Sequence, residues 1–144
     1  MFDRILVVCV GNICRSPTAE FMLKAALPSK HISSAGLGAL VGHDMNTQAK
    51  AVAERAGLNC PLHHARQLTR ELCHETDLIL VMENRHREGV TQLCPEARGK
   101  VFLLAQGLVP SDIADPYRKS DAVFAQTYEQ LQQACTAWVQ RLTR

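Results

Sequence analysis

Residues 5–17 read Ile5-Leu6-Val7-Val8-Cys9-Val10-Gly11-Asn12-Ile13-Cys14-Arg15-Ser16-Pro17 and fall into three parts. The first part, residues 5–9, is an unbroken apolar run rich in β-branched side chains, which is typical of a strand buried on both faces. A short loop follows, and Ser16-Pro17 then signals the start of a helix over residues 18–27. A strand, a tight loop and a helix in direct succession indicate an α/β fold.

The rest of the chain continues this alternation of strand and helix patterns. Further strands are predicted at residues 31–34, 77–82 and 100–104, and helices at 46–56, 69–73, 84–93 and 120–142. The last helix repeats apolar side chains every three or four positions, so one of its faces should be buried. Strands that alternate with helices predict a single α/β domain, with a four-stranded parallel sheet that helices cover on both faces.

Composition limits the classes of protein to consider. The chain has 144 residues, enough to bury a core as one domain, and 16 Lys and Arg against 14 Asp and Glu. A net charge of +2 gives no basic footprint for nucleic acid. The apolar runs are too short for membrane insertion, and the N-terminus lacks the pattern of a secretory signal. We therefore expect a cytoplasmic protein whose six cysteines are thiols: Cys9, Cys14, Cys60, Cys73, Cys94 and Cys135.

A cysteine six residues before an arginine is the spacing used by cysteine-dependent phosphatases, but the spacing alone is weak. Three pairs have it: Cys9/Arg15, Cys60/Arg66 and Cys135/Arg141. Cys135 and Arg141 lie on one predicted helix, about 240° apart around its axis, so they cannot share a site. Cys60 follows no strand, and Pro61 removes a backbone donor from its loop. Cys60 with His63 and His64 also lacks a second ligand pair, so no metal is expected.

The loop after Cys9 has the features of an anion cradle. It starts at the carboxyl end of a strand, where ligands bind in open α/β sheets. Gly11 can adopt a positive φ and Asn12 tolerates one, so the loop can turn its N–H groups inward towards the positive end of a helix. Arg15 can close the far side with a bidentate guanidinium group, and the same field favours the thiolate of Cys9. The hydroxyl of Ser16 either donates to that sulfur or caps the helix.

A phosphoryl group that leaves an alcohol or phenol oxygen requires a proton donor for that oxygen. Among the carboxylic acids of the chain, Asp115 is the best placed by its surroundings, in the sequence Asp115-Pro116-Tyr117. Pro116 stiffens the turn, and Tyr117 offers a flat wall for a phenyl ring. The alternative interpretation is a solvated turn residue.

Together these residues resemble the low-molecular-weight protein tyrosine phosphatases. The resemblance rests on residues 8–17 and on 115–117, and it extends over essentially the whole chain. Residues 38–43 and 115–120 resemble the bacterial branch linked to capsule or exopolysaccharide export. The family resemblance implies a flavodoxin-like fold over residues 1–144, hydrolysis of phosphotyrosine and no cofactor. It also implies a membrane tyrosine autokinase as substrate. From the small net charge we expect no nucleic-acid partner, and we expect a monomer or weak oligomer.

The resemblance also implies roles for individual residues. Cys9 would form a phosphocysteine intermediate, and Asp115 would protonate the leaving phenolate and then activate water. Asn12 would hold the shape of the loop, and Ser16 would stabilise the thiolate. The implied phosphate-binding residues are Val10, Gly11, Asn12, Ile13, Cys14, Arg15 and Ser16. Leu40 and Tyr117 would line the slot for the substrate ring, although many eukaryotic relatives carry aromatic residues at position 40 and after Tyr117.

Some interpretations stay open at this point. Cys14 is either a redox partner of Cys9 or a packed thiol, and Cys60, Cys73 and Cys94 are interpreted as packing thiols. Arg118 and Lys119 either favour acidic substrates or form a solvated rim. An arsenate reductase of the same fold is an alternative, but it requires two resolving cysteines where residues 82–94 contain only Cys94. A phosphotyrosine-binding module without turnover is the second alternative.

Overall fold

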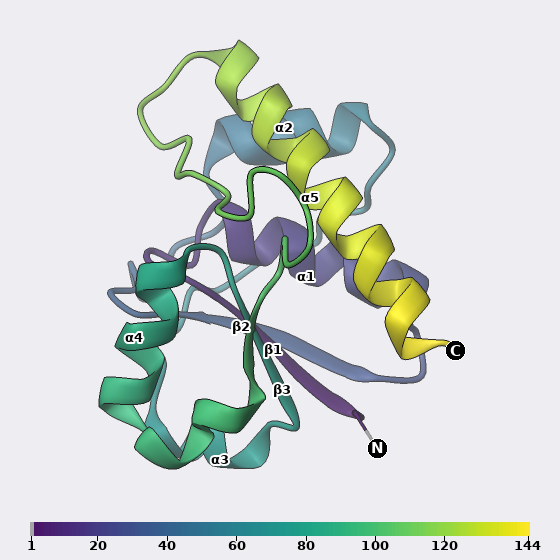
Figure 1. Cartoon of the computed structure of the whole chain (residues 1–144). Coiled ribbons are helices and arrows are strands. Elements are labelled where there is room, and N and C mark those ends of the chain that lie inside the picture. Colours follow the sequence, from purple (N-terminus) through teal and green to yellow (C-terminus); the bar gives the residue numbers. More distant parts are fainter. Residues whose placement is uncertain (1) are drawn as a thin grey trace.

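A computed structural model describes residues 2–144 of the chain, which alternate strands and helices along most of their length (Figure 1). The elements in order are β1 (Arg4–Cys9), α1 (Arg15–Ala26), β2 (His31–Gly36), α2 (Thr47–Arg55), α3 (Arg70–Glu75), β3 (Leu78–Val81), α4 (Asn84–Leu93), a 3₁₀ helix η1 (Pro95–Lys100), β4 (Val101–Leu103) and α5 (Asp121–Leu142). The predicted α/β architecture is confirmed.

The four strands form one parallel sheet in the order β2-β1-β3-β4. Val7 of β1 lies beside Ser34 of β2 on one side and beside Leu80 of β3 on the other. The chain therefore leaves β1 towards one edge of the sheet and later returns to build the other. Such a reversal of strand order opens a crevice at the carboxyl ends of the strands, where β1 and β3 end.

The central strand β1 is buried on both faces, as its apolar sequence predicted. Ile5 and Val7 pack with α1 and α5, whereas Leu6 and Val8 pack with α3 and α4, because successive side chains of a strand point to opposite faces. Figure 1 shows α1 and α5 on one side of the sheet and α3 and α4 on the other. These two layers fix the ends of β1 and β3 in a rigid frame.

Helix α5 buries one face against α1, α2 and the sheet. Its buried side chains recur every three or four positions: Phe124, Thr127, Leu131, Ala134, Cys135 and Trp138. Fully burying an apolar side chain of this size contributes about 1.5–3 kcal/mol, so this stripe accounts for the position of the helix. Cys135 lies in the core, whereas the guanidinium of Arg141 lies 4.8 Å from the centre of the Trp138 ring.

Two differences from the predicted elements have simple causes. Helix α1 begins at Arg15, three residues earlier than predicted, because a proline within the first helical turn costs no hydrogen bond there. Residues 95–100 form a short 3₁₀ helix that starts at a proline; it was not predicted, and it includes the first residue of the predicted strand 100–104. No helix within residues 2–144 has both the length and the apolar character needed to cross a bilayer.

Candidate active site

Residues 9–15, the cradle loop, connect the end of β1 to the start of α1 and border a pocket of about 160 Å³. The lining residues are Cys9, Val10, Gly11, Ile13, Cys14, Arg15, Leu40, Asp115 and Tyr117. The structure thus brings together the predicted nucleophile, arginine, acid and slot residues, although they come from three separate parts of the sequence.

The carbonyl groups of the cradle loop point away from the pocket. Those of Cys9, Val10 and Gly11 accept hydrogen bonds of 2.9–3.0 Å from backbone N–H groups of residues 37–40. The Ile13 carbonyl accepts from the Asn46 N–H at 2.8 Å. No backbone N–H of residues 10–14 donates to a carbonyl oxygen elsewhere in residues 2–144. With the carbonyls fixed outward, the free donors surround the pocket as in an anion-binding nest.

Asn12 supplies the left-handed turn that gives the loop this shape. Its φ is +59°, and its side chain is fully buried. The sequence allowed a positive φ at Gly11 as well, but in the structure Asn12 adopts it and Gly11 lies outside the left-handed region. Asn is among the few residues that occupy this conformation readily, because its short amide can bond to nearby groups.

The Asn12 side chain connects the loop to its surroundings. Its amide nitrogen donates to Ser16 Oγ at 2.8 Å and to Ser34 Oγ at 2.9 Å, and its amide oxygen accepts from the Arg66 N–H at 2.9 Å. Ser16 Oγ also lies 2.9 Å from Cys9 Sγ. Because Asn12 already donates to this hydroxyl, the Ser16 proton is free to point at the sulfur. Ser16 lies inside α1 rather than at its N-cap, so the geometry favours the donor over the capping interpretation.

Several supporting residues were not found from the sequence. His63 Nε2–H donates to the Asn12 carbonyl at 2.7 Å, and Ser34 Oγ donates to the buried carboxylate of Glu20 at 2.5 Å. Gly36 lies so close to the loop that a side chain there would strike the Val10 carbonyl. No local signal in the sequence links Gly36 to the loop, because their contact depends on how β2 aligns with β1.

The guanidinium of Arg15 is almost completely buried and is held on one side. Its Nη1 donates to Glu83 Oε2 at 2.5 Å and to the Ile113 carbonyl at 2.7 Å. Burial opposes ionisation of Glu83, but hydrogen bonds from Arg15 and Arg85 outweigh it and lower the pKa of the carboxyl. Glu83 was not predicted. Its position just after β3 was the available signal, because the carboxyl ends of neighbouring parallel strands meet at one edge.

Asp115 lies across the pocket on the acid loop, residues 104–120, which connects β4 to α5. Its Oδ2 is 3.9 Å from Arg15 Nη2, and its Oδ1 accepts the Tyr117 N–H at 3.0 Å. The Asp115 side chain is 45% exposed, so water and a substrate can reach it. Tyr117 and Leu40 are also about 40% exposed, as residues at the rim of a slot should be.

Burial is the main influence on the pKa of several of the remaining thiols. Burial, then the charge of Asp115 and the nearby Cys9, raise the pKa of Cys14 to about 12. Burial likewise raises the pKa of Cys135 to about 12 and that of Cys73 to about 11. All six cysteines are buried and unpaired. The packing interpretation fits Cys60, Cys73 and Cys94, whereas both interpretations of Cys14 remain open.

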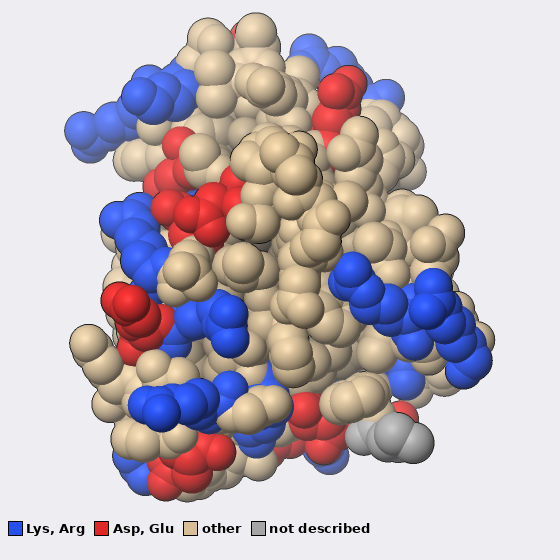
Figure 2. All heavy atoms as spheres, in the orientation of Figure 1, with Lys and Arg blue, Asp and Glu red and all other residues tan. Residues whose placement is uncertain are grey.

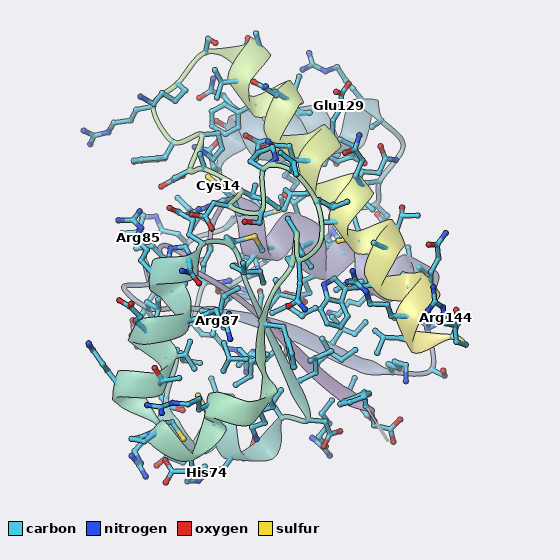
Figure 3. All side chains as sticks on the ribbon, viewed as in Figure 1. Cys14, His74, Arg85, Arg87, Glu129 and Arg144 are labelled. Carbon is cyan, nitrogen blue, oxygen red and sulfur yellow. The ribbon has the colours of Figure 1, made fainter. Side chains whose placement is uncertain are left out.

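One group of possible metal-ligand atoms lies elsewhere in the described chain. Atoms of His74, Cys94 and Glu96 lie within 4.8 Å of one another. Both oxygens of Glu96 accept hydrogen bonds from Arg70, and Oε1 also accepts from Cys94 Sγ at 3.0 Å. A cation thus already neutralises this carboxylate. Figure 3 shows His74 at the opposite end of α4 from Arg85, which lies at the end nearer Cys14.

Charged side chains of both signs, Arg15 and Asp115, line the pocket. Figure 2 shows acidic atoms between basic ones on the side of the molecule where α4 begins. Arg118 and Lys119 are exposed next to Tyr117, and the Arg118 guanidinium lies 5.4 Å from the centre of the Tyr117 ring. Two cations therefore lie beside Tyr117 at the rim of the pocket.

Comparisons with known proteins agree with this geometry. The sequence profile of the family described as low molecular weight phosphotyrosine protein phosphatase matches residues 4–144. The chain is 49% identical over 142 residues to the low molecular weight protein-tyrosine-phosphatase Wzb of Escherichia coli strain K12, covering 99% of this chain and 97% of Wzb. The crystal structure of the Erwinia amylovora tyrosine phosphatase AmsI is 47% identical, with a TM-score of 0.98, and covers 100% of this chain and 95% of AmsI. Vibrio vulnificus Wzb in complex with benzylphosphonate is 45% identical, with a TM-score of 0.95, covering 98% and 99%.

The matched region includes both the cradle loop and the acid loop. The sequence identity to these relatives is far above the level at which two proteins share only a fold. The resemblance seen in the sequence is therefore confirmed, and the chain belongs to the low molecular weight phosphotyrosine protein phosphatase family, a family of hydrolases.

Proposed function

We propose that the protein hydrolyses phosphotyrosine in proteins through a phosphocysteine intermediate on Cys9. The observation that carries this proposal is the pocket geometry: inward N–H groups surround the space beside a cysteine sulfur, with Arg15 and Asp115 at its edge. The printed names of the relatives, and a benzylphosphonate complex of Vibrio vulnificus Wzb, support an aromatic phosphate ester as substrate.

In the first step the Cys9 thiolate attacks phosphorus and the bond from phosphorus to the tyrosine oxygen breaks. The N–H groups of residues 10–15 and the free side of the Arg15 guanidinium stabilise the charge on the equatorial oxygens. Asp115, in its acid form, donates its proton to the departing phenolate. The presence of Asp115 in the lining of the same pocket as Cys9 supports this role, because the acid must reach the leaving oxygen of a phosphoryl group that the sulfur attacks.

In the second step water attacks the phosphocysteine. The Asp115 carboxylate accepts a proton from the water, the P–S bond breaks, and inorganic phosphate forms. The sulfur leaves as a thiolate, and the Ser16 hydroxyl 2.9 Å away donates to it. Asn12 keeps this hydroxyl in place by donating to its oxygen. The chain's own residues thus supply each proton and each stabilising charge, and the proposal includes no metal or cofactor.

We further propose that the whole chain, residues 1–144, forms one catalytic domain in the cytoplasm. Its substrate is the phosphotyrosine segment of a membrane tyrosine autokinase that controls exopolysaccharide or capsule production. Kinship with Wzb and AmsI supports this choice. The exposed Arg118 and Lys119 support a substrate segment that is itself acidic. The protein is expected to act as a monomer or weak oligomer, without nucleic acid.

Turnover of matched peptides tests the activity. The purified protein should release phosphate from a phosphotyrosine peptide and from p-nitrophenyl phosphate, and release little from the same peptide with phosphoserine. After an acid quench, mass spectrometry should locate the phosphoryl group on Cys9. Hydrolysis without a phosphorylated cysteine would refute the intermediate, and binding without hydrolysis would favour the non-catalytic module. Arsenate-dependent oxidation of a thioredoxin system would favour the reductase.

Capture of the substrate tests the partner. The Asp115→Ala variant retains the cradle but lacks the acid, so it should hold phosphotyrosine proteins from a lysate of the source cells for longer than the wild type does. We expect a membrane tyrosine kinase among the retained proteins. Release by vanadate, an anion that occupies the cradle, is the control for binding at the pocket. Retention of other phosphotyrosine proteins without a kinase would contradict the proposed partner but not the activity.

A further inference from the structure

A buried imidazole at the start of α4 takes no part in the reaction steps above. His86 is the third residue of α4, and its side chain is only 2% exposed. Its Nδ1 accepts a hydrogen bond of 3.2 Å from the Glu83 N–H. Because an accepting nitrogen carries no proton, the neutral ring has its proton on Nε2. Burial and the charge of Arg15 favour this neutral form and lower the pKa of His86 to about 4.

The protonated nitrogen lies near the carboxylate that holds Arg15. Among the described residues, His86 Nε2 is a fully buried side-chain nitrogen without a hydrogen-bond partner. Glu83 Oε2 lies 3.5 Å from it, beyond a good hydrogen bond but close enough for attraction. The same oxygen accepts from Arg15 Nη1 at 2.5 Å. The Glu83 carboxylate therefore lies between the imidazole and the guanidinium.

Arg15 has a second carboxylate within reach, which is why a contact that holds Glu83 in place is useful. Its Nη2 is 3.9 Å from Asp115 Oδ2 on the opposite side. If Glu83 moved away, Arg15 would be drawn towards Asp115 and leave the position from which it faces the phosphoryl oxygens. The Ile113 carbonyl, 2.7 Å from Nη1, is the other group that holds Arg15 on the Glu83 side.

Other charged groups near His86 do not replace this contact. Arg85 binds Glu83 from the solvent side, and its side chain is 70% exposed, as its outward direction in Figure 3 also shows. Asp112 of the acid loop accepts the Asn84 N–H at 2.9 Å rather than a bond from the imidazole. On the buried side of Glu83, His86 and Arg15 are thus the two side-chain donors that face the carboxylate.

We propose that His86 is a positioning residue for the reaction: its neutral ring, fixed by the Glu83 N–H, orients the Glu83 carboxylate and through it the guanidinium of Arg15. This inference rests on the proposed function for its effect on turnover, but its effect on anion binding does not require turnover. His86 itself lies behind Glu83 and does not contact the pocket.

Two substitutions test the roles of the two ring nitrogens of His86 separately. His86→Asn keeps an acceptor near the Nδ1 position for the Glu83 N–H but loses the donor towards Oε2. His86→Gln carries an amide that reaches the Nε2 position. We expect His86→Asn to lower kcat for p-nitrophenyl phosphate by roughly three- to tenfold and to weaken binding of inorganic phosphate by a similar factor, the effect of losing one polar contact to a charged group. His86→Gln should recover most of both losses.

The background variant Glu83→Gln shows whether His86 acts through Glu83. In that background His86→Asn should change kcat and phosphate affinity by less than a factor of two, because the carboxylate it orients is gone. His74→Asn, a substitution of an exposed histidine on α3, is the matched control and should change neither quantity. Melting temperatures of all variants show how much of any loss of kcat or phosphate affinity results from unfolding.

Calorimetric titration with inorganic phosphate tests the positioning role of His86 separately from the proposed phosphatase activity. If the wild type binds phosphate but hydrolyses no phosphotyrosine, the proposed function fails while His86→Asn still tests the positioning role. A phosphate affinity of folded His86→Asn equal to that of the wild type would overturn the inference. A full loss that persists in the Glu83→Gln background would overturn it as well.

Discussion

The cradle loop is mostly buried and its carbonyl groups are bonded to the surrounding chain, whereas the acid loop is anchored by its buried residues but exposed around its carboxylate. Asn12 and Arg15 of the cradle loop are each at most 1% exposed. In the acid loop Ile113 is fully buried, with its N–H bonded to the Met82 carbonyl at 2.9 Å, but Asp115 two residues later is 45% exposed. One side of the pocket is thus preformed in the buried frame, and the acid reaches the other side from the exposed end of a loop.

This difference follows from what each side has to do. Free N–H groups bind an anion well only if they cost no rearrangement at the moment of reaction, so the cradle needs a rigid frame. The acid must release a proton, accept one from water and let the product leave, which requires contact with solvent. We therefore expect substitutions in the cradle loop to affect folding and turnover together, and substitutions at the exposed end of the acid loop to affect turnover alone.

The largest effect on turnover is expected from substitution of Cys9. Cys9→Ser should abolish turnover of p-nitrophenyl phosphate within detection, because a serine hydroxyl at this position has no base to activate it and is a far weaker nucleophile than a thiolate. Cys60→Ser is the matched control, since Cys60 also precedes an arginine by six residues but lies away from the pocket lining. Near-normal activity of Cys9→Ser would contradict the mechanism.

The contrast between these two cysteines shows what the sequence could predict. The strand before Cys9, the Gly11-Asn12 pair and the helix start after it are local signals, and they identified the loop. The sequence also excluded the Cys60/Arg66 pair as a catalytic site, yet Arg66 turns out to support the Cys9 loop by donating to Asn12. No local pattern predicts that contact, because it joins residues 54 positions apart.

The same limit applies to the partners of Arg15. Glu83 and Ile113 lie 68 and 98 positions away, and they meet Arg15 because β3 pairs beside β1 and the acid loop packs over their ends. Strand order follows from the summed packing of two helical layers, which local propensity does not encode. Asp115 was selected by residue type and by family resemblance, and its distance to Arg15 depends on the same packing.

The second largest effect on turnover is expected from substitution of Asp115. Asp115→Ala should lower kcat by about 10²–10⁴-fold, the size of a general-acid contribution. Its melting temperature should stay within about 2 °C of the wild type, because the side chain is half exposed. The loss should be larger for phenyl phosphate than for p-nitrophenyl phosphate, whose leaving group needs less protonation. Unchanged activity would point to Asp112 as the acid.

A smaller effect on turnover, joined to a loss of stability, is expected at Asn12. Asn12→Ala removes hydrogen bonds to Ser16, Ser34 and Arg66 and strains a residue at positive φ. We expect it to lower the free energy of unfolding by about 2–4 kcal/mol and kcat by about tenfold or more. Asn12→Gly removes the bonds without the strain, so it should be about 1 kcal/mol more stable than Asn12→Ala. Urea unfolding measures both, and equal stability of Asn12→Ala and wild type would refute a rigid cradle.

The smallest effect is expected at Arg118, which has a φ of +64° but sits exposed in the acid loop. Arg118→Gly relieves the left-handed strain, but it also increases the entropy of the unfolded chain and removes the weak contact with the Tyr117 ring. These terms nearly cancel, so the free energy of unfolding should change by less than about 1 kcal/mol. Activity on p-nitrophenyl phosphate should be unchanged, and any loss should be confined to acidic phosphotyrosine peptides. Asn12 and Arg118 share one backbone conformation, so a large destabilisation by Arg118→Gly would mean that the exposed end of the acid loop is as rigid as the cradle.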